Sequence, residues 1–234
     1  MKKVTFLIIL VVIVIPCFAQ TAADKSVSVL SFKVGDVPVT IPAPTKEFSE
    51  VGYDNREIME VAVPPANRLV CAFVLKSDLP RLTRHDEELK LTRYAFVEVP
   101  RRGEYMDWKT SDFKKLIETM KGSLGNTISS SVEESEEELN HRLKSLDLNT
   151  KVRIGQPVQL GCFFYKENAF GFGMIVEYMM GNKAVKVVVG TMVLRVKERL
   201  LYAYLYAEYK DINTIKWVRK TMEQWSDTIL KANR

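Results

Sequence analysis

The chain has 234 residues, of which 47% are hydrophobic and 27% are charged, and its formal net charge is +5. This length and composition suit one large domain, or a domain with an appendage, that buries a sizeable core. Basic and acidic residues are interleaved, so the sequence lacks the concentrated basic surface of a nucleic-acid-binding protein.

Residues 1–19 have the pattern of a secretory signal peptide. Lys2 and Lys3 precede an unbroken apolar run over residues 6–15, and small residues suit a cleavage site after Ala19. The run is shorter than the ~20 residues that a spanning helix needs, and no later segment is long enough to span. We therefore expect a periplasmic or secreted protein that keeps no transmembrane segment after cleavage and has a net charge reduced from +5 to +3.

A lipoprotein signal is the alternative interpretation of the same segment. In that case Cys17 would carry the lipid, but Pro16 stands where the lipidation motif needs a small residue. We therefore expect cleavage without lipidation.

Short strands and turns are predicted for the first hundred residues. Gly35 suits the turn of a hairpin between residues 29–33 and 37–41. Further strands are expected at residues 58–63, 69–75 and 91–99. The nearly continuous apolar run of the second of these is typical of a strand in the centre of a sheet. The polar segment 45–55 and the charged segment 77–90 are interpreted as irregular, exposed loops.

The middle of the chain, at about 100–155, is interpreted as a helical insertion between two blocks of strand. Apolar residues recur at helical spacing over residues 110–121, and Gly122 suits the end of that helix. Ser131 and Glu134 fit a capping box at the start of a second helix. The second helix has few apolar positions, so we expect it at the surface.

The stretch from 157 to 209 predicts four consecutive strands, followed by a covering helix at 211–232. In the last strand the even-numbered residues from Tyr202 to Tyr206 point to one face, and Ala203 and Leu205 to the other. The helix carries a stripe of apolar residues every three or four positions, including Trp225. Its stripe is expected to pack on the Ala/Leu side of the last strand.

These elements predict an α+β fold in a single domain over residues 20–234. Its antiparallel sheet combines the C-terminal four-strand meander with the N-terminal strands. Helices cover both faces, and the long C-terminal helix packs on the sheet.

The C-terminal quarter resembles the PsbP/Mog1-like α/β/α sandwich. The segment VLRVKERLLYAYLYAEYKDINTIKWVRKTMEQW has that fold's ending: a strand, a turn, an aromatic-rich strand, an acidic link and an amphipathic helix. Members of that fold are mostly non-catalytic accessory or binding proteins. The resemblance thus implies binding rather than chemistry, and it supplies no site residues.

Common catalytic motifs are absent from the sequence, which has no G-x-S-x-G, Walker loop, H-E-x-x-H or C-x-x-C. The densest group of acid/base or metal-ligating side chains contains His85, Asp86 and Glu87. A solvated charged loop is the favoured interpretation, because a working site needs residues that converge from several elements. His141 is expected to face solvent on the second helix, and neither a cofactor nor a metal is expected.

Cys71 and Cys162 are the two cysteines of the mature chain. Outside the cytosol they could form a disulfide, but both lie in apolar runs where a free, buried cysteine is also common. We expect both to be buried, whether or not they are bonded.

The alternating tyrosines of the last strand, Tyr202, Tyr204 and Tyr206, are the candidate ligand-binding residues. On an open face they could grip a peptide, glycan or lipid. The favoured interpretation is that the helix at 110–121 covers them as part of a second core layer.

Three functions follow from these observations. The leading hypothesis is a periplasmic or secreted non-catalytic module that binds a protein or envelope component. A hydrolase that uses loop carboxylates such as Asp86 or Glu87 is the first alternative. A lipid or hydrophobe carrier, with its ligand between the sheet and the middle helices, is the second.

Overall fold

The computed structural model describes residues 30–84, 90–130, 132–145, 151–181 and 183–234. The strands in this part are β1 (Ser31–Val34), β2 (Val37–Thr40), β3 (Phe48–Glu50), β4 (Asn67–Leu75), β5 (Arg93–Pro100), β6 (Val152–Ile154), β7 (Val158–Lys166), β8 (Ala169–Met180), β9 (Lys183–Val196) and β10 (Arg199–Glu208). The helices are η1 (Tyr53–Asn55), α1 (Arg56–Glu60), α2 (Leu79–Thr83), η2 (Arg101–Gly103), α3 (Thr110–Ser130), α4 (Val132–Ser145) and α5 (Ile212–Ala232).

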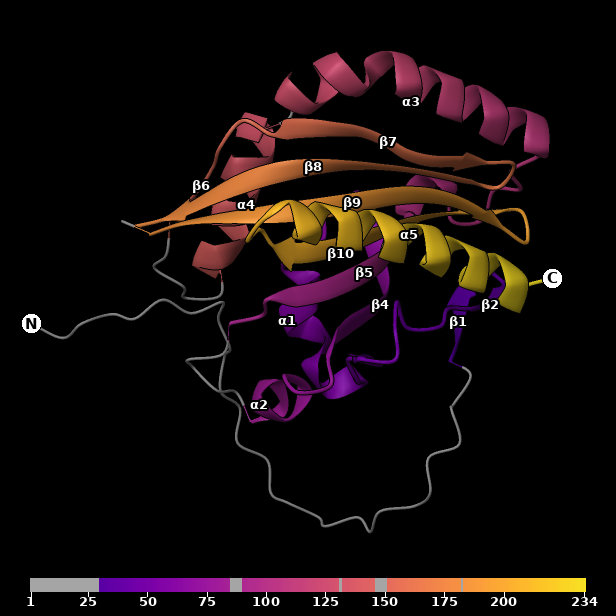
Figure 1. Ribbon diagram of the computed structural model, residues 1–234. Coiled ribbons are helices and arrows are strands. Elements are labelled where there is room, and N and C mark those ends of the chain that lie inside the picture. The colour runs from indigo at the N-terminus through magenta and orange to yellow at the C-terminus, as the bar shows by residue number, and fades with distance from the viewer. Residues whose placement is uncertain (1–29, 85–89, 131, 146–150, 182) are drawn as a thin grey trace, which may run out of the picture.

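An eight-stranded antiparallel sheet forms the centre of the molecule. Its strand order is β3-β4-β5-β10-β9-β8-β6, and β7 also pairs with β8. Helix α5 covers one face, while α1, α2 and α4 lie on the other side and α3 lies beside β7 (Figure 1). The predicted α+β class, with helices on both faces and α5 on the sheet, is confirmed.

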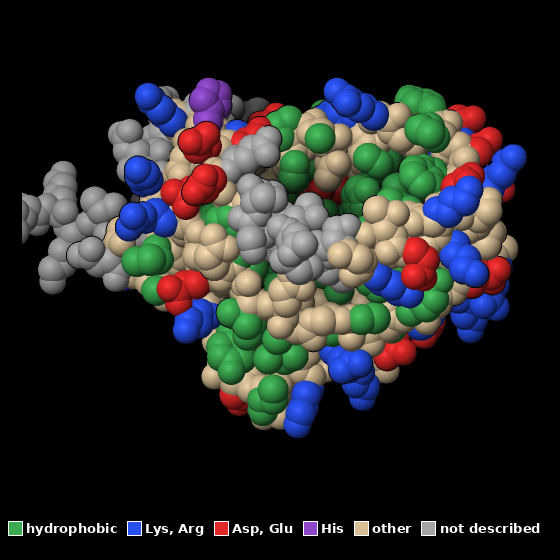
Figure 2. Space-filling model, turned by 90° about the horizontal axis from the view of Figure 1, so that it is seen from above, with side chains coloured by type: hydrophobic (Ala, Val, Ile, Leu, Met, Phe, Trp, Pro, Cys, Tyr) green, Lys and Arg blue, Asp and Glu red, His purple; other side chains and the backbone are tan. Residues whose placement is uncertain are grey.

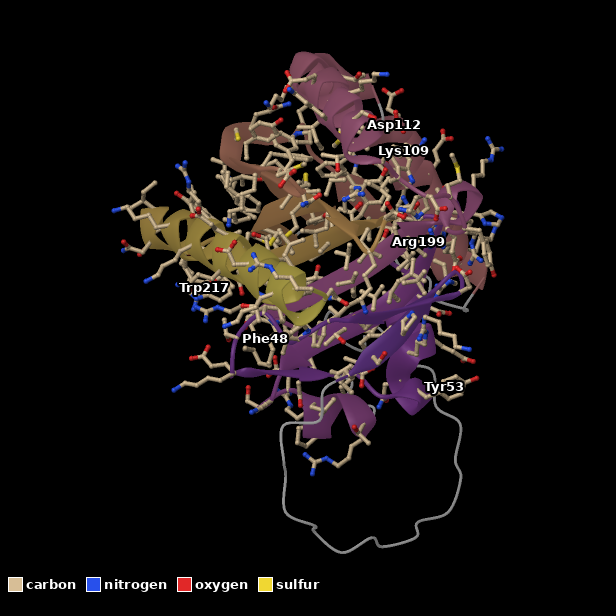
Figure 3. All side chains as sticks on the ribbon, turned by 90° about the vertical axis from the view of Figure 1, so that its right-hand side faces the viewer. Phe48, Tyr53, Lys109, Asp112, Arg199 and Trp217 are labelled. Carbon is tan, nitrogen blue, oxygen red and sulfur yellow. The ribbon has the colours of Figure 1, made fainter. Side chains whose placement is uncertain are left out.

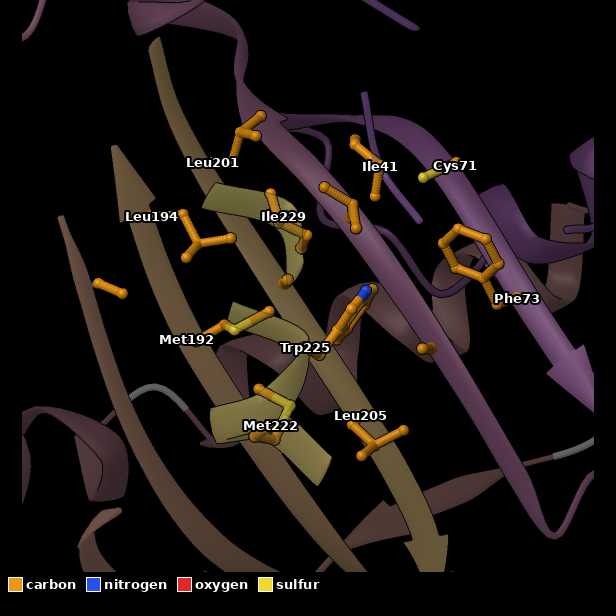
Figure 4. Packing of buried hydrophobic residues seen from close by; sticks show 14 of the residues in the cluster. Ile41, Cys71, Phe73, Met192, Leu194, Leu201, Leu205, Met222, Trp225 and Ile229 are labelled. Atoms are coloured by element: carbon orange, nitrogen blue, oxygen red, sulfur yellow. The ribbon is translucent and has the colours of Figure 1, made fainter. Parts of the chain in front are cut away.

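Helix α5 approaches the sheet closely because the strand beneath it has a glycine. A Cβ added at Gly190 of β9 would lie 2.8 Å from side-chain atoms of both Val218 and Met222. Trp225 is fully buried, and its indole N–H donates to the carbonyl of Pro42 at 2.7 Å. Figure 4 shows its ring among the labelled core side chains, near Phe73. The apolar stripe predicted for this helix is therefore the lid of the main core.

Two glycines of β8 make room for the rings of β7. A Cβ at Gly171 would lie 2.4 Å from the ring of Phe164, and one at Gly173 would lie 2.0 Å from the ring of Phe163. Both rings are buried in the main core because β7 has a bulge between Cys162 and Phe164, which turns neighbouring side chains to the same face. The two glycines thus allow β7 and β8 to pack closely.

The predicted strand at 58–63 is wrong, because this segment begins in helix α1. Arg56 and Glu60 form an ion pair of 2.9 Å across one helical turn, and Met59 is buried against β4. Within the segments interpreted as loops, β3 and α2 are additional elements. Strand β4 is buried on both faces as expected, but it lies next to the edge strand β3 rather than in the centre of the sheet.

The two helices of the middle segment are present, but the predicted end at Gly122 is wrong. Helix α3 continues to Ser130, since nothing crowds or caps the chain at Gly122 and the buried Phe113 and Ile117 anchor the helix upstream. Helix α4 is tied to β6 by Asn140, whose side chain donates to the Val152 carbonyl at 2.7 Å and accepts from the Val152 N–H at 2.8 Å.

A buried arginine joins the β1–β2 hairpin to the main sheet. Arg199, at the start of β10, is 6% exposed, and its guanidinium pairs with Asp36 of the hairpin turn at 2.7 Å and with Asp107 before α3. Figure 3 shows Arg199 on the side of the molecule where these segments meet, near Lys109.

Candidate functional site

The face of the sheet opposite α5 carries a row of aromatic side chains with one carboxyl among them. In the β10–β5 register, Tyr202 is opposite Glu98 and Tyr206 is opposite Tyr94. Residues directly opposite in an antiparallel pair have Cβ atoms about 5 Å apart and point to the same face. We define the tyrosine face as Tyr94, Glu98, Tyr202, Tyr204 and Tyr206.

The helices on this side cover the tyrosine face only in part. Tyr202 packs in the cluster that contains Phe113 and Ile117 of α3, whereas Tyr204 and Tyr206 pack in the cluster of Met59 and Leu82 from α1 and α2. All three tyrosines of β10 remain partly exposed. Seen from above, the molecule is hollowed beside α3 on the side away from α5, and hydrophobic side chains line much of the hollow (Figure 2).

Glu98 is the buried charge of this face. The residue is 2% exposed, and its carboxyl accepts a hydrogen bond from the side chain of Asn67 at 2.8 Å. Burial raises the pKa of the Glu98 carboxyl to about 7, against the opposing effects of Asn67 and of the positive charge of Arg142. At neutral pH this carboxyl thus exists in both protonated and ionised forms.

The tyrosines form a stack beside this carboxyl. The rings of Tyr94 and Tyr206 are 4.5 Å apart and nearly parallel, and those of Tyr204 and Tyr206 are 6.3 Å apart. Burial raises the pKa of Tyr204 and Tyr206 well above the usual value, and the negative charge of Glu98 raises it further. These hydroxyls therefore stay protonated and can donate hydrogen bonds.

Helix α4 places a cation near the same face. Arg142 donates hydrogen bonds to the carbonyls of Val61, at 3.1 Å, and Val63, and it forms an ion pair with Glu138 at 3.0 Å. These bonds fix the guanidinium between α4 and the segment after α1. The site thus combines aromatic rings, hydroxyl donors and a titrating carboxyl, an arrangement suited to holding a ligand that is part apolar and part polar.

The structure brings together the three tyrosines that the sequence predicts as ligand-binding, but it adds two residues that the prediction missed. Glu98 and Tyr94 share their face because they alternate along β5 with Ala95 and Val97, which point to the α5 side. A glutamate at an inward position of an otherwise apolar strand is the signal that could have identified this residue.

Of the other predicted candidates, His85, Asp86 and Glu87 lie outside the described residues. His141 is exposed on α4, as expected. Within the part of the chain that the structure describes, no group of three His, Cys, Asp or Glu side chains could hold a metal ion.

The expectation that both cysteines are buried is half wrong. Cys71 on β4 is buried, but Cys162 on β7 is exposed, and both thiols are free. Four strands separate β4 from β7, so spacings of about 4.8 Å per strand keep the two residues on the order of 20 Å apart. A disulfide needs Cα atoms within about 7 Å, so these two cannot bond to each other in this fold.

A small cavity lies at the other end of the sheet, beside β3. Its volume is about 90 Å³. It is lined by Glu50, Val51, Tyr53, Arg56, Leu69, Cys71 and Ala72. For comparison, an apolar cavity of about 150 Å³ binds benzene. This cavity therefore has room for a small solute but not for a lipid chain.

Fold and site together define an α+β protein with a row of partly exposed tyrosines beside a buried carboxyl. No family model and no curated protein matches the chain. Among solved structures, a mutant of the protein Mog1 is similar over 87% of this chain and 93% of that chain, with 14% sequence identity and a TM-score of 0.33. This is a weak likeness at the level of the fold alone.

Within the described ranges, no helix is both long and apolar enough to span a bilayer.

Proposed function

We propose that this protein is an exported, non-catalytic binding protein and that the tyrosine face is its ligand site. The observation that carries the proposal is the buried Glu98 carboxyl among partly exposed tyrosines. The signal-peptide pattern of residues 1–19 supports a periplasmic or secreted location, and the ligand is a protein or another component of the cell envelope.

The energetics of Glu98 favour a functional role over a structural one. Burying a carboxyl that keeps part of its charge destabilises a fold, and an apolar residue at this position would avoid that cost. Perturbed carboxyls of this kind are concentrated at functional sites. The core beneath α5, on the other face of the sheet, consists mainly of apolar side chains that are almost fully buried. The buried carboxyl of Glu98 differs from that pattern.

The tyrosines supply contact area at low entropic cost. Each ring has two rotatable bonds, and stacking with a neighbour already restricts it in the free protein. Their protonated hydroxyls donate to ligand oxygens, while the Glu98 carboxyl accepts from ligand donors when it is ionised.

An acid/base enzyme is the second candidate, favoured by the pKa of about 7 at Glu98. In this alternative Glu98 is the acid/base group, in place of the loop carboxylates such as Asp86 and Glu87 that the sequence suggested. A ligand that is recovered unchanged supports the binding protein, whereas one that is converted to a product supports the enzyme. A lipid carrier, with its ligand between the sheet and the middle helices, gains nothing from the 90 Å³ cavity, which lies beside β3 and is too small for an acyl chain.

Native mass spectrometry of the protein purified from its own cells tests the proposal. We expect the wild type to carry a bound component that adds a defined mass. Glu98→Gln and the double variant Tyr204→Phe/Tyr206→Phe keep the shape of the site but remove a charge or two hydroxyls. Each is expected to lower the occupancy about tenfold or more, as loss of hydrogen bonds from charged or buried groups does.

The matched control is Tyr105→Phe, which removes the hydroxyl of an exposed tyrosine elsewhere. It should retain the bound component at the wild-type level. Equal occupancy in all four proteins would place the ligand away from the tyrosine face and would contradict the proposal.

A further inference from the structure

The cavity beside β3 exists because the sheet is interrupted at this edge. Strand β3 ends at Glu50, and after the Val51 N–H bonds to the Ala72 carbonyl at 2.8 Å the chain turns away into η1 and α1. Opposite this gap, β4 has a bulge between Leu69 and Cys71. The cavity occupies the space between the bulge and the departing chain. Figure 3 shows Tyr53 at the edge of the molecule, directed outward, and its side chain is 88% exposed.

The bulge fixes an arginine at the cavity. A bulge takes a strand out of regular pairing, and here the Leu69 carbonyl accepts hydrogen bonds from the side chains of Arg56 and, at 3.3 Å, Arg68. The Arg56 Nε also donates to Glu60 at 2.9 Å. The Arg56 guanidinium is thus held on two sides before any ligand arrives.

A carboxyl and a thiol face the same space. Glu50 is half-buried, and within the described part of the chain it forms no ion pair with Arg56. Burial raises the pKa of the Glu50 carboxyl, and the positive charge of Arg56 lowers it. Cys71 is buried, and it lines the cavity together with Glu50 and Arg56. Burial raises the pKa of its thiol.

Arg56 is paired with Glu60 through Nε, but within the described residues its Nη1 makes no hydrogen bond and Glu50 makes no ion pair with it. Groups of opposite charge that line one cavity in this way favour a ligand with both charges. Glu50 repels a simple anion such as phosphate or acetate, and Arg56 repels a simple ammonium ion. A ligand with an ammonium and a carboxylate satisfies both groups, and the fixed guanidinium matches a carboxylate in geometry. From this juxtaposition we infer that the cavity is a binding site for a small zwitterionic α-amino acid, with its ammonium on Glu50 and its carboxylate on Arg56.

The volume limits the size of the side chain. About 90 Å³ is less than the roughly 150 Å³ that accommodates the six carbons of benzene. Glycine, with about five heavy atoms, is therefore the amino acid that suits this volume. This site is separate from the tyrosine face and does not depend on the function proposed for it.

An NMR titration of ¹⁵N-labelled protein tests the inference. Glycine is expected to shift the backbone amides of Glu50, Arg56 and Cys71 in a saturable way. Acetate and methylammonium each carry one of the two charges and are expected to bind about tenfold more weakly or worse. Glu50→Gln and Arg56→Gln should each weaken glycine binding by a similar factor.

Glu57→Gln is the control, because Glu57 is exposed on the same helix and does not line the cavity. It should bind glycine like the wild type. Three results would each overturn the inference. The first is that glycine causes no saturable shift, and the second is that acetate or methylammonium binds as tightly as glycine. The third is that Glu57→Gln and Glu50→Gln weaken glycine binding equally.

Discussion

At the scale of single residues, Glu98 connects the stability of the protein to pH. Its carboxyl has a pKa of about 7 in the folded protein, against a usual value of 4.5, because burial disfavours the ionised form. Between these two pH values the folded state binds more protons than the unfolded state. Glu98 therefore contributes no penalty below pH 4.5, and its penalty grows as the pH rises and is complete above pH 7.

Glu98→Gln removes this titration while keeping an oxygen that accepts from Asn67. The free energy of unfolding of the variant should depend on pH as that of the wild type does, except that the contribution of Glu98 is absent. It should then be the more stable protein at pH 8, by up to about 3 kcal/mol, with the advantage shrinking towards pH 4.5. Urea unfolding of both proteins at several pH values measures the difference. A difference that is constant across this range would mean that the carboxyl is not perturbed.

Two glycines give a second test at this scale. Gly190→Ala puts a methyl group within 2.8 Å of Val218 and Met222, so α5 must shift, at an expected cost of about 1–3 kcal/mol. Gly122→Ala meets nothing within 4 Å inside α3 and should stabilise the protein by about 0.5–1 kcal/mol. Denaturant unfolding should show changes of opposite sign in the free energy of unfolding for the two variants. An unchanged free energy in Gly190→Ala would contradict the close approach of helix and sheet.

At the scale of elements, α5 is the part whose removal should cost most. Trp225 is fully buried and lies edge-on to Phe73, with ring centroids 6.0 Å apart. Trp225→Ala should lower the free energy of unfolding by about 3–5 kcal/mol, a large share of the 5–15 kcal/mol typical of a domain. Lys220→Ala, on the exposed side of the same helix, should change it by no more than about 0.5 kcal/mol. Equal unfolding midpoints would mean that α5 is a detachable arm rather than a lid.

Elements with long, regular patterns could be predicted from the sequence. Strands β7 to β10 and helix α5 repeat their apolar residues over many positions. Asp211 caps α5 by accepting a hydrogen bond from the Asn213 N–H at 2.8 Å. Helix α1 has five residues, and a short apolar run of that length has the same appearance in a helix and in a strand. The prediction failed there because the pattern was too short to show a period.

The candidate site was harder to predict, because its position depends on pairing between distant strands. The tyrosines of β10 alternate visibly, but Glu98 joins them only because β5 pairs with β10 in a register that places it opposite Tyr202. Cys162 was assigned to the core from its apolar neighbours. It is exposed because the register of β7 shifts on both sides of it, between Gln159 and Gly161 and between Cys162 and Phe164, which breaks the regular alternation of inward and outward side chains.

At the scale of the whole molecule, the expected export can be checked by mass. We predict that the exported protein begins at Gln20 and carries no lipid, since Pro16 disfavours acylation of Cys17. Intact-mass analysis of the protein recovered outside the cytosol gives the answer. A chain that starts at an acylated Cys17, or one that keeps its first 19 residues, would contradict the prediction.

The two faces of the sheet differ in polarity. The α5 face is apolar and closed, whereas the opposite face keeps tyrosines, a titrating carboxyl and a hollow beside α3 (Figure 2). A ligand on this face should change the surroundings of the β10 tyrosines and leave tyrosines at distant surfaces unaffected.

NMR of protein labelled with ¹³C in its tyrosine rings measures this directly. The component identified by native mass spectrometry is added stepwise to the labelled protein. We predict saturable shifts in the ring signals of Tyr202, Tyr204 and Tyr206, with no change at the exposed Tyr53 and Tyr105. Unchanged signals from the β10 tyrosines at full occupancy would contradict the account, because the ligand would then lie elsewhere on the protein.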